Sequence, residues 1–85
     1  MPHFFYLARC ADCSLYAGTC LNLQEREEKH NAGTGAKYTR SRSPIKIIYS
    51  EEFDTLSEAR KREAEVKKWT KDKKEGLLKN VELRM

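Results

Sequence analysis

Two tyrosines near the start of the chain, Tyr6 and Tyr16, carry phenol groups that could hold or move a proton. Each lies in a segment typical of a β-strand, because residues 4–10 and 15–20 are rich in aromatic and apolar side chains. Residues 12–14 between these segments are of the types that form turns. We therefore expect a β-hairpin that carries both phenols.

The length of the hairpin loop decides whether the two phenols share a face of the sheet. A three-residue loop that pairs Cys10 with Ser14 places Tyr6 opposite Gly18, and both tyrosines then point to one face. A two-residue loop would put them on opposite faces. We favour the first register, since an isolated tyrosine on each face makes less sense. Gly18 itself indicates a bend or a close approach by another backbone.

A short helix after the hairpin offers a guanidinium and an imidazole on one face. Asn22 is a good N-cap with Glu25 three residues later, so the helix should cover residues 23–31. Its inward stripe, by helical spacing, is Leu23, Arg26, Glu27 and His30. Only the first of these is apolar, so the helix is better suited to building a site than to packing. An ordinary surface helix is the alternative.

One carboxylate in the second half of the chain falls where an apolar side chain is expected. Thr55 and Glu58 form a second capping pair, and the helix that they begin should run to about Lys68. Its inward stripe is Leu56, Ala59, Glu63 and Val66. A carboxylate on such a stripe is costly unless it is paired or bound to a cation. Glu63 is therefore a candidate cation ligand, with a salt bridge to a basic neighbour as the alternative.

The excess of positive charge is concentrated in one loop. The chain has a formal net charge of +4, and residues 34–49 contain no acidic side chain. Their basic side chains are Lys37, Arg40, Arg42 and Lys46. This loop is either simply solvated or a contact for nucleic-acid phosphates.

Three cysteines raise the hypothesis of a zinc-stabilised hairpin. Cys10 and Cys13 have the CxxC spacing of zinc hairpins, and Cys20 with His30 could complete four ligands. We disfavour zinc because there is no second CxxC, and because Cys20 and His30 would have to converge on the hairpin tip from an adjoining strand and helix. An odd number of cysteines also argues against a disulfide framework.

The order of the expected elements defines one α+β domain. Pro44 opens a third strand at residues 45–49, and its isoleucines indicate a buried, central position. Residues 33–40 should form a loop or short turn, and Thr70 should cap a last short helix that ends at Leu78. We predict a single domain over residues 1–85, β-β-α-β-α-α, with a three-stranded sheet flanked by helices. Its core would span about residues 4–78, and the tail from residue 80 would be frayed.

Length and composition limit the classes of function. A chain of 85 residues can build one small core, and no apolar run approaches the ~20 residues needed to cross a bilayer. The N-terminus lacks the basic start and apolar stretch of a signal peptide. We therefore expect a cytoplasmic protein with no membrane segment. The mild basic excess fits a nucleic-acid partner without requiring one.

These residues together resemble the GIY-YIG nuclease domain. Phe4-Phe5-Tyr6 lies where that family has Gly-Ile-Tyr, and Tyr16-Ala17-Gly18 lies where it has Tyr-Ile-Gly. Arg26 and His30 match the family's helix residues, and Glu63 matches its metal-binding glutamate. The resemblance extends from Phe4 to Leu78 and is greatest for a small single-domain bacterial branch whose members have no settled role. Cys13 stands where that branch usually has glycine, and Thr19-Cys20 where it more often has Tyr-Thr.

The resemblance implies a divalent-metal-dependent endonuclease that hydrolyses phosphodiester bonds in DNA or structured nucleic acid, with DNA favoured over RNA. Glu63 would hold one Mg²⁺ or Mn²⁺, and Arg26 would bind the scissile phosphate. Tyr6 would position or deprotonate the attacking water, His30 would relay a proton, and Tyr16 would complete the network. Contacts to the nucleic-acid backbone would come from Lys37, Tyr38, Arg40 and Arg42.

A different class of function is a non-catalytic nucleic-acid-binding module that keeps the same fold. In either case a domain this small has no room for a separate specificity domain. A protein partner could therefore supply substrate specificity.

Overall fold

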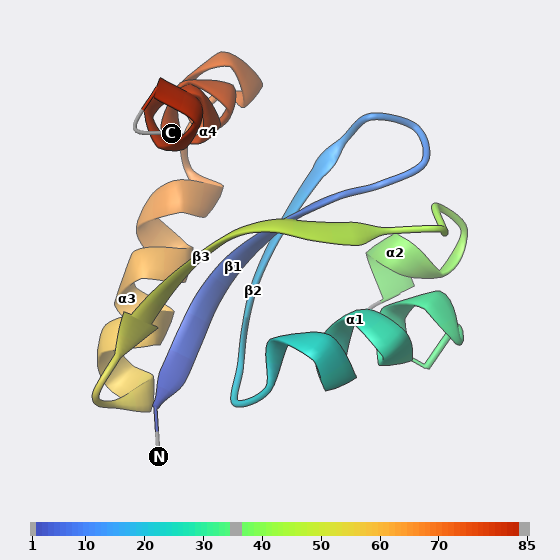
Figure 1. Cartoon of the computed structure of the whole chain (residues 1–85), viewed down its shortest axis with the longest axis horizontal. Coiled ribbons are helices and arrows are strands. Elements are labelled where there is room, and N and C mark those ends of the chain that lie inside the picture. Colours follow the sequence, from blue (N-terminus) through green and yellow to red (C-terminus); the bar gives the residue numbers. More distant parts are fainter. Residues whose placement is uncertain (1, 35–36, 84–85) are drawn as a thin grey trace.

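In the computed structural model the described residues are 2–34 and 37–83, and side chains are described except for Tyr38 and residues 79–83. The elements are β1 (His3–Arg9), β2 (Leu15–Cys20), α1 (Leu23–Asn31), α2 (Lys37–Arg40), β3 (Lys46–Phe53), α3 (Leu56–Lys67) and α4 (Lys71–Leu83) (Figure 1). The predicted α+β order is confirmed, and α2 is a single helical turn in the segment expected to be a loop or short turn. None of the helices in the described part of the chain is long and apolar enough to span a bilayer.

The hairpin of β1 and β2 has the register that places both tyrosines on one face. Tyr6 pairs with Gly18 and Ala8 with Tyr16, and the amide of Cys10 donates to the carbonyl of Ser14 at 2.9 Å. Within the three-residue loop, Cys13 has a φ of +70°. This left-handed conformation is one that glycine adopts without steric cost and that other residues adopt only with strain.

The expected central position of the third strand is wrong. The strand order is β2-β1-β3, so β1 is central and β3 lies at an edge. The two isoleucines of β3 pack on opposite faces of the sheet, Ile47 on the α1 side and Ile48 on the α3 side, and α1 covers the outer edge of the strand. The side chain of Asn31 exchanges two hydrogen bonds with the backbone of Ile45, at 2.7 and 3.0 Å, and Glu27 Oε1 accepts from the amide of Ile47 at 2.7 Å. These side chains satisfy backbone groups that an edge strand would otherwise leave exposed.

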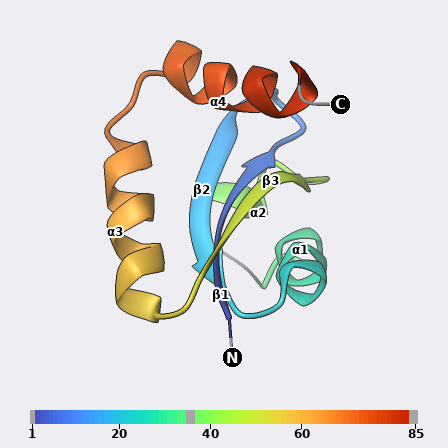
Figure 2. The same ribbon diagram turned by 60° about the vertical axis from the view of Figure 1, so that its left-hand side comes forward.

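The sheet separates two layers of helices, with α3 on one face and α1 on the other, while α4 crosses one end (Figure 2). The alternation of side chains along β1 explains the division. On the α3 side, the core is formed by Phe5, Leu7, Leu15, Ala17, Val66 and Leu78. On the α1 side, the buried residues are Tyr6, Ala8, Cys10 and Ile45, with Tyr16, Cys20, Leu23 and Ile47 packed against them. The two tyrosines therefore face α1, and α3 approaches from the opposite face.

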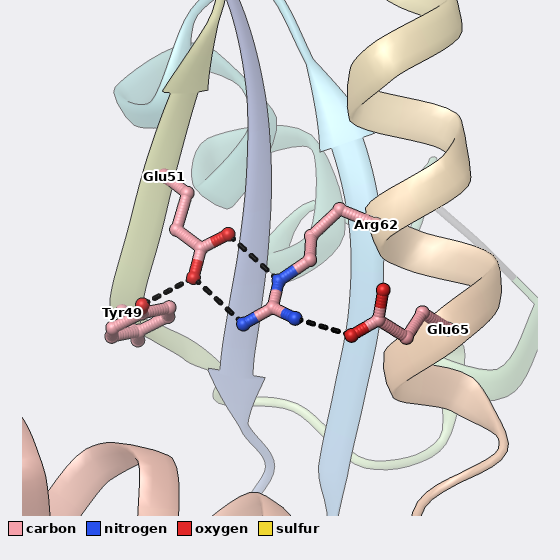
Figure 3. A network of polar contacts seen from close by, with 4 residues as sticks. All are labelled: Tyr49, Glu51, Arg62 and Glu65. Atoms are coloured by element: carbon pink, nitrogen blue, oxygen red, sulfur yellow. Dashed lines mark hydrogen bonds and ion pairs between the residues drawn. The ribbon is translucent and has the colours of Figure 1, made fainter.

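A polar network fixes α3 on the sheet (Figure 3). Arg62 of α3 forms a bidentate ion pair with Glu51 of β3, at 2.9 and 3.1 Å, and a third bond to Glu65 at 2.7 Å. Its guanidinium also lies 5.1 Å from the centre of the Trp69 ring. Tyr49 donates to the same Glu51 carboxylate, and burial together with this bond raises the pKa of Tyr49 to about 12. The network holds α3 at one rotation about its axis.

Two details of the helical half differ from the sequence expectations. Leu56, expected on the inward stripe of α3, is 38% exposed, because the first turn of the helix extends beyond the core. Helix α4 continues to Leu83, five residues past its expected end, since no glycine or proline follows Leu78 to stop it. The expected helix end at Leu78 is thus too early, whereas the expected fraying of the tail from residue 80 stays a prediction, and residues 84–85 lie outside the described chain.

Candidate active site

A chain of hydrogen bonds links β1, α1 and α2 on the tyrosine face of the sheet. Arg26 Nε donates to Tyr6 Oη at 3.4 Å. Tyr6 Oη lies 2.8 Å from His30 Nε2, and His30 Nδ1 lies 2.7 Å from Thr39 Oγ1. A guanidinium can only donate, so Tyr6 accepts from Arg26, and in the His30 tautomer with an unprotonated Nε2 the Tyr6 hydroxyl donates to Nε2. A neutral His30 then donates from Nδ1 to Thr39.

Burial sets the protonation of this network. Tyr6, His30 and Thr39 have no exposed surface. Burial raises the pKa of Tyr6 to about 12, against the opposing effect of Arg26. Burial, and then the positive charge of Arg26, lower the pKa of His30. Both groups are therefore neutral at pH 7, which is compatible with this assignment of donors.

The two tyrosines differ in their access to solvent. Tyr16 is only half-buried, with its ring centre 5.4 Å from that of His30 and 6.3 Å from that of Tyr6. Tyr6, which the resemblance implied as the residue that positions or deprotonates water, cannot reach solvent in this conformation. The geometry favours Tyr16 for contact with water or substrate and Tyr6 for holding Arg26 and His30.

Gly18 makes room for the buried phenol. A Cβ at this position would lie 2.6 Å from Tyr6 Oη and 2.7 Å from its Cζ. The close approach expected at Gly18 is therefore that of the Tyr6 side chain across the strand pair, rather than that of another backbone. Tyr6 can reach Arg26 and His30 only because position 18 has no side chain.

Gly18→Ala should destabilise the protein by about 1–3 kcal/mol, because the added methyl group must displace Tyr6 from its hydrogen bonds. Urea unfolding would measure the change. Gly76→Ala is the matched control, since Gly76 is in α4 and has nothing within 4 Å of a built Cβ. That substitution should stabilise the protein by about 0.5–1 kcal/mol. Equal effects of the two substitutions would contradict the role given to Gly18.

His30 should make the folded state sensitive to mild acid. Its pKa is lowered on folding, so below the ordinary value of about 6.5 the unfolded chain binds a proton that the folded chain excludes. The free energy of unfolding should fall as pH drops through this value, by up to about 1.4 kcal/mol per pH unit. His30→Gln should flatten this slope, whereas His3→Gln should retain it. Unfolding curves between pH 5 and about pH 8 would test this.

Glu63 lies on α3, on the other side of the β2 edge from this network. Its side chain is 22% exposed, and Oε1 is 3.6 Å from Nζ of Lys67, one helical turn later. The same Nζ lies 6.0 Å from the centre of the Tyr16 ring. Lys67 thus connects the carboxylate to the tyrosine, and the candidate site wraps around the edge of β2. The salt bridge with a basic neighbour, which the sequence left as an alternative for Glu63, is present.

The donor set of the site fits a hard divalent cation. Among the described residues, no three His, Cys, Asp or Glu side chains converge as a metal-binding group. Mg²⁺ does not require such a group, because it is commonly held by one or two carboxylates, water and substrate phosphates. Glu63, a partly exposed carboxylate that already faces a cation, meets this need.

The structure separates the four ligands of the hypothetical zinc hairpin. Cys10 and Cys13 lie at the hairpin loop, whereas Cys20 pairs with Phe4 at the far end of β2. Both nitrogens of His30 are engaged by Tyr6 and Thr39. The described part of the chain therefore does not bring the four proposed ligands together.

The basic candidates fall into two groups. Lys37 and Arg40 are exposed on α2, on either side of the buried Thr39 that supports His30. Arg42 instead forms an ion pair with Asp12 at 3.0 Å and joins the segment before β3 to the hairpin loop. The side chain of Tyr38 lies outside the described residues.

A hollow of about 300 Å³ lies beside the basic side chain of the network. It is lined by residues from the end of β2 and the start of α1: Thr19, Cys20, Leu21, Asn22, Glu25, Arg26 and Lys29. Arg26 therefore reaches a surface that a ligand can enter, while the His30 imidazole and the Tyr6 phenol behind it have no exposed surface.

The sequence analysis missed two contacts of this site, Thr39 and Lys67. Thr39 lies in a loop-like, basic stretch with no periodic pattern to predict its burial. Lys67 follows Glu63 by four residues, the spacing of a helical ion pair, which was a readable signal.

Comparison with known proteins agrees with the geometry. The family model described as the GIY-YIG catalytic domain matches residues 2–76, a range that includes every residue of the candidate site. A UPF0213 protein of Staphylococcus aureus (strain NCTC 8325 / PS 47) is 49% identical over 77 residues, which cover 91% of this chain and 94% of the relative.

Two solution NMR structures are similar to this chain. That of the UPF0213 protein BH0048 from Bacillus halodurans has a TM-score of 0.60 and 39% identity, covering 93% of this chain and 84% of that one. That of the protein EF2693 from E. faecalis has a TM-score of 0.64 and 45% identity, covering 98% and 88%. None of these names states an activity.

Proposed function

Since this chain belongs to the GIY-YIG catalytic domain family, we propose that it is a divalent-metal-dependent endonuclease acting on DNA or structured nucleic acid. The observation that carries the proposal is the grouping around the β2 edge. There, an arginine, a neutral histidine and two tyrosines lie on one side, and a partly exposed carboxylate with a cation lies on the other. Phosphodiester hydrolysis needs an aligned water and stabilisation of phosphate charge, which these groups can supply.

Glu63 is the residue that would hold the metal, together with water molecules. A bound Mg²⁺ or Mn²⁺ would neutralise phosphate charge and stabilise the leaving oxygen. On the opposite side, Arg26 uses its Nε to donate to Tyr6. The scissile phosphate would therefore be bound by the two Nη groups, in the planar geometry that suits phosphate oxygens.

Tyr16 is the better candidate for orienting the attacking water, because it is the tyrosine with solvent access and lies next to His30. Tyr6, with a pKa of about 12 and no exposed surface, would act as a positioning residue. It holds Arg26 and His30 at fixed distances. His30, kept neutral by burial, can accept a proton that reaches Nε2 through the phenol network.

The exposed basic side chains of α2 should contribute affinity without sequence specificity. Lys37→Ala or Arg40→Ala should weaken binding to any nucleic acid and reduce the slope of log Kd against log salt by about 0.9 per lost phosphate contact. Arg42→Ala should have less effect on binding, because Arg42 is paired with Asp12. Fluorescence anisotropy over a range of salt concentrations would measure this. Unchanged affinity and slope in both α2 variants would mean that α2 is only solvated.

The proposal is tested by incubating the purified protein with supercoiled plasmid, branched duplex, single-stranded DNA and RNA, with Mg²⁺ or with EDTA. We expect cleavage of at least one substrate in Mg²⁺ and of none in EDTA. Binding without cleavage on every substrate would instead support the non-catalytic module. A pull-down with the intact protein would show whether a protein partner supplies specificity.

A further inference from the structure

Lys67 is a cation placed between the two halves of the candidate site. Its ammonium faces the Glu63 carboxylate at 3.6 Å and the ring of Tyr16 at 6.0 Å. An exposed lysine has many rotamers, and its side chain is 51% exposed here. Its position over two residues of the site therefore reflects the negative carboxylate and the electron-rich ring face.

The ammonium lies 3.6 Å from an oxygen of the carboxylate that would bind a divalent cation. Both cations need the same carboxylate, and two positive charges at such short range repel each other. Since an exposed ion pair contributes at most about 1 kcal/mol, a divalent ion can displace the ammonium. The long, flexible side chain of Lys67 can then turn to the nearest other anion, which in a nuclease is a substrate phosphate.

We propose that Lys67 is an exchangeable counter-ion of the site: it neutralises Glu63 in the free protein and moves to a substrate phosphate when a divalent metal binds. The inference rests on the proposed function, because it takes Glu63 as the metal ligand. It adds a substrate-binding residue on α3 and a reason for metal and nucleic acid to favour each other's binding. When the metal releases Lys67, the nucleic acid gains a phosphate contact and binds more tightly. By the same coupling, bound nucleic acid raises the affinity of the site for the metal.

The first test measures Mn²⁺ affinity of the protein alone, by the loss of the electron paramagnetic resonance signal of free Mn²⁺. Lys67→Met keeps the aliphatic stem and removes the competing charge, so it should raise Mn²⁺ affinity about threefold. Lys61→Met is the matched control, because Lys61 is an exposed lysine of the same helix and its loss changes the net charge equally. Glu63→Gln should abolish the binding.

The second test measures binding of a phosphorothioate DNA duplex, which resists cleavage, at equal ionic strength in Mg²⁺ and in EDTA. Lys67→Met should weaken duplex binding by about threefold in Mg²⁺ and by less in EDTA, where Lys67 is paired with Glu63. Lys61→Met should have the same effect in both solutions.

The outcomes separate the inference from the proposed function. If Glu63→Gln loses Mn²⁺ binding but Lys67→Met binds Mn²⁺ like the wild type, the exchange is refuted and the metal site stands. An equal gain in affinity for Lys61→Met would refute the exchange too, because net charge alone would explain it. If wild type and Glu63→Gln bind Mn²⁺ equally, the metal site itself is refuted.

Discussion

Glu63→Gln should remove metal-dependent cleavage and leave the protein folded. The substitution keeps the shape of the side chain and removes the charge that would hold the cation, so the cleavage rate should fall at least about a hundredfold. Stability should change by less than about 1 kcal/mol, because the ion pair with Lys67 is partly exposed. Binding of nucleic acid in EDTA should survive or strengthen, since one negative charge leaves the site.

Thermal unfolding distinguishes loss of the metal from loss of the fold. The wild-type melting temperature should rise with Mg²⁺ or Mn²⁺ concentration, because a ligand of the folded state stabilises it. The Glu63→Gln melting temperature should not respond. Glu65→Gln is a matched control on the same helix, since Glu65 is 57% exposed and pairs with Arg62. A normal metal response in Glu63→Gln would place the metal elsewhere.

Arg26→Ala should have the largest effect on the tyrosine side of the site. The loss of the phosphate-binding guanidinium should reduce kcat/KM by about a thousandfold. The cost in stability should be only about 1 kcal/mol, because the one hydrogen bond from Nε to Tyr6 is long, at 3.4 Å. Arg26→Lys keeps the charge without the planar fork, so it should recover little activity.

Kinetics and chemical denaturation on the same preparations would check this prediction. Tyr6 keeps its bond to His30 in either variant, so the fold should persist. If Arg26→Ala unfolds the protein, or if Arg26→Lys restores full activity, the guanidinium is not acting as a specific phosphate ligand.

Local sequence signals were enough to predict most of the fold. The capping residues Asn22 and Thr55 begin α1 and α3 as expected, each accepting a bond from the amide three residues later. The Cys10–Ser14 hydrogen bond closes the three-residue loop and agrees with the hairpin register. These features depend on residues close in sequence. The edge position of β3 does not, because it is set by which strand pairs with β1 and by the side chains of α1 that cover its outer edge.

The same limit applies to the candidate site. Helical spacing places Arg26 and His30 on one face, and strand alternation places Tyr6 and Tyr16 on one face. Their depth of burial is a tertiary property: Tyr6 is fully buried because Gly18 leaves space for its ring and α1 closes over it. Sequence spacing could therefore not predict that Tyr16 is half-buried with access to solvent while Tyr6 is fully buried. The reach of Lys67 around the β2 edge is another tertiary contact of this kind.

The central claim is that the residues around the β2 edge form a metal-dependent nuclease site. The most direct measurement is nicking of supercoiled plasmid or branched duplex by wild type and Glu63→Gln, purified in parallel and assayed with Mg²⁺ and with EDTA. The predicted result is nicking by the wild type in Mg²⁺ but not in EDTA, and no nicking by Glu63→Gln in either solution. Equal nicking by both proteins, or none by the wild type while it still binds the substrate, would contradict the claim.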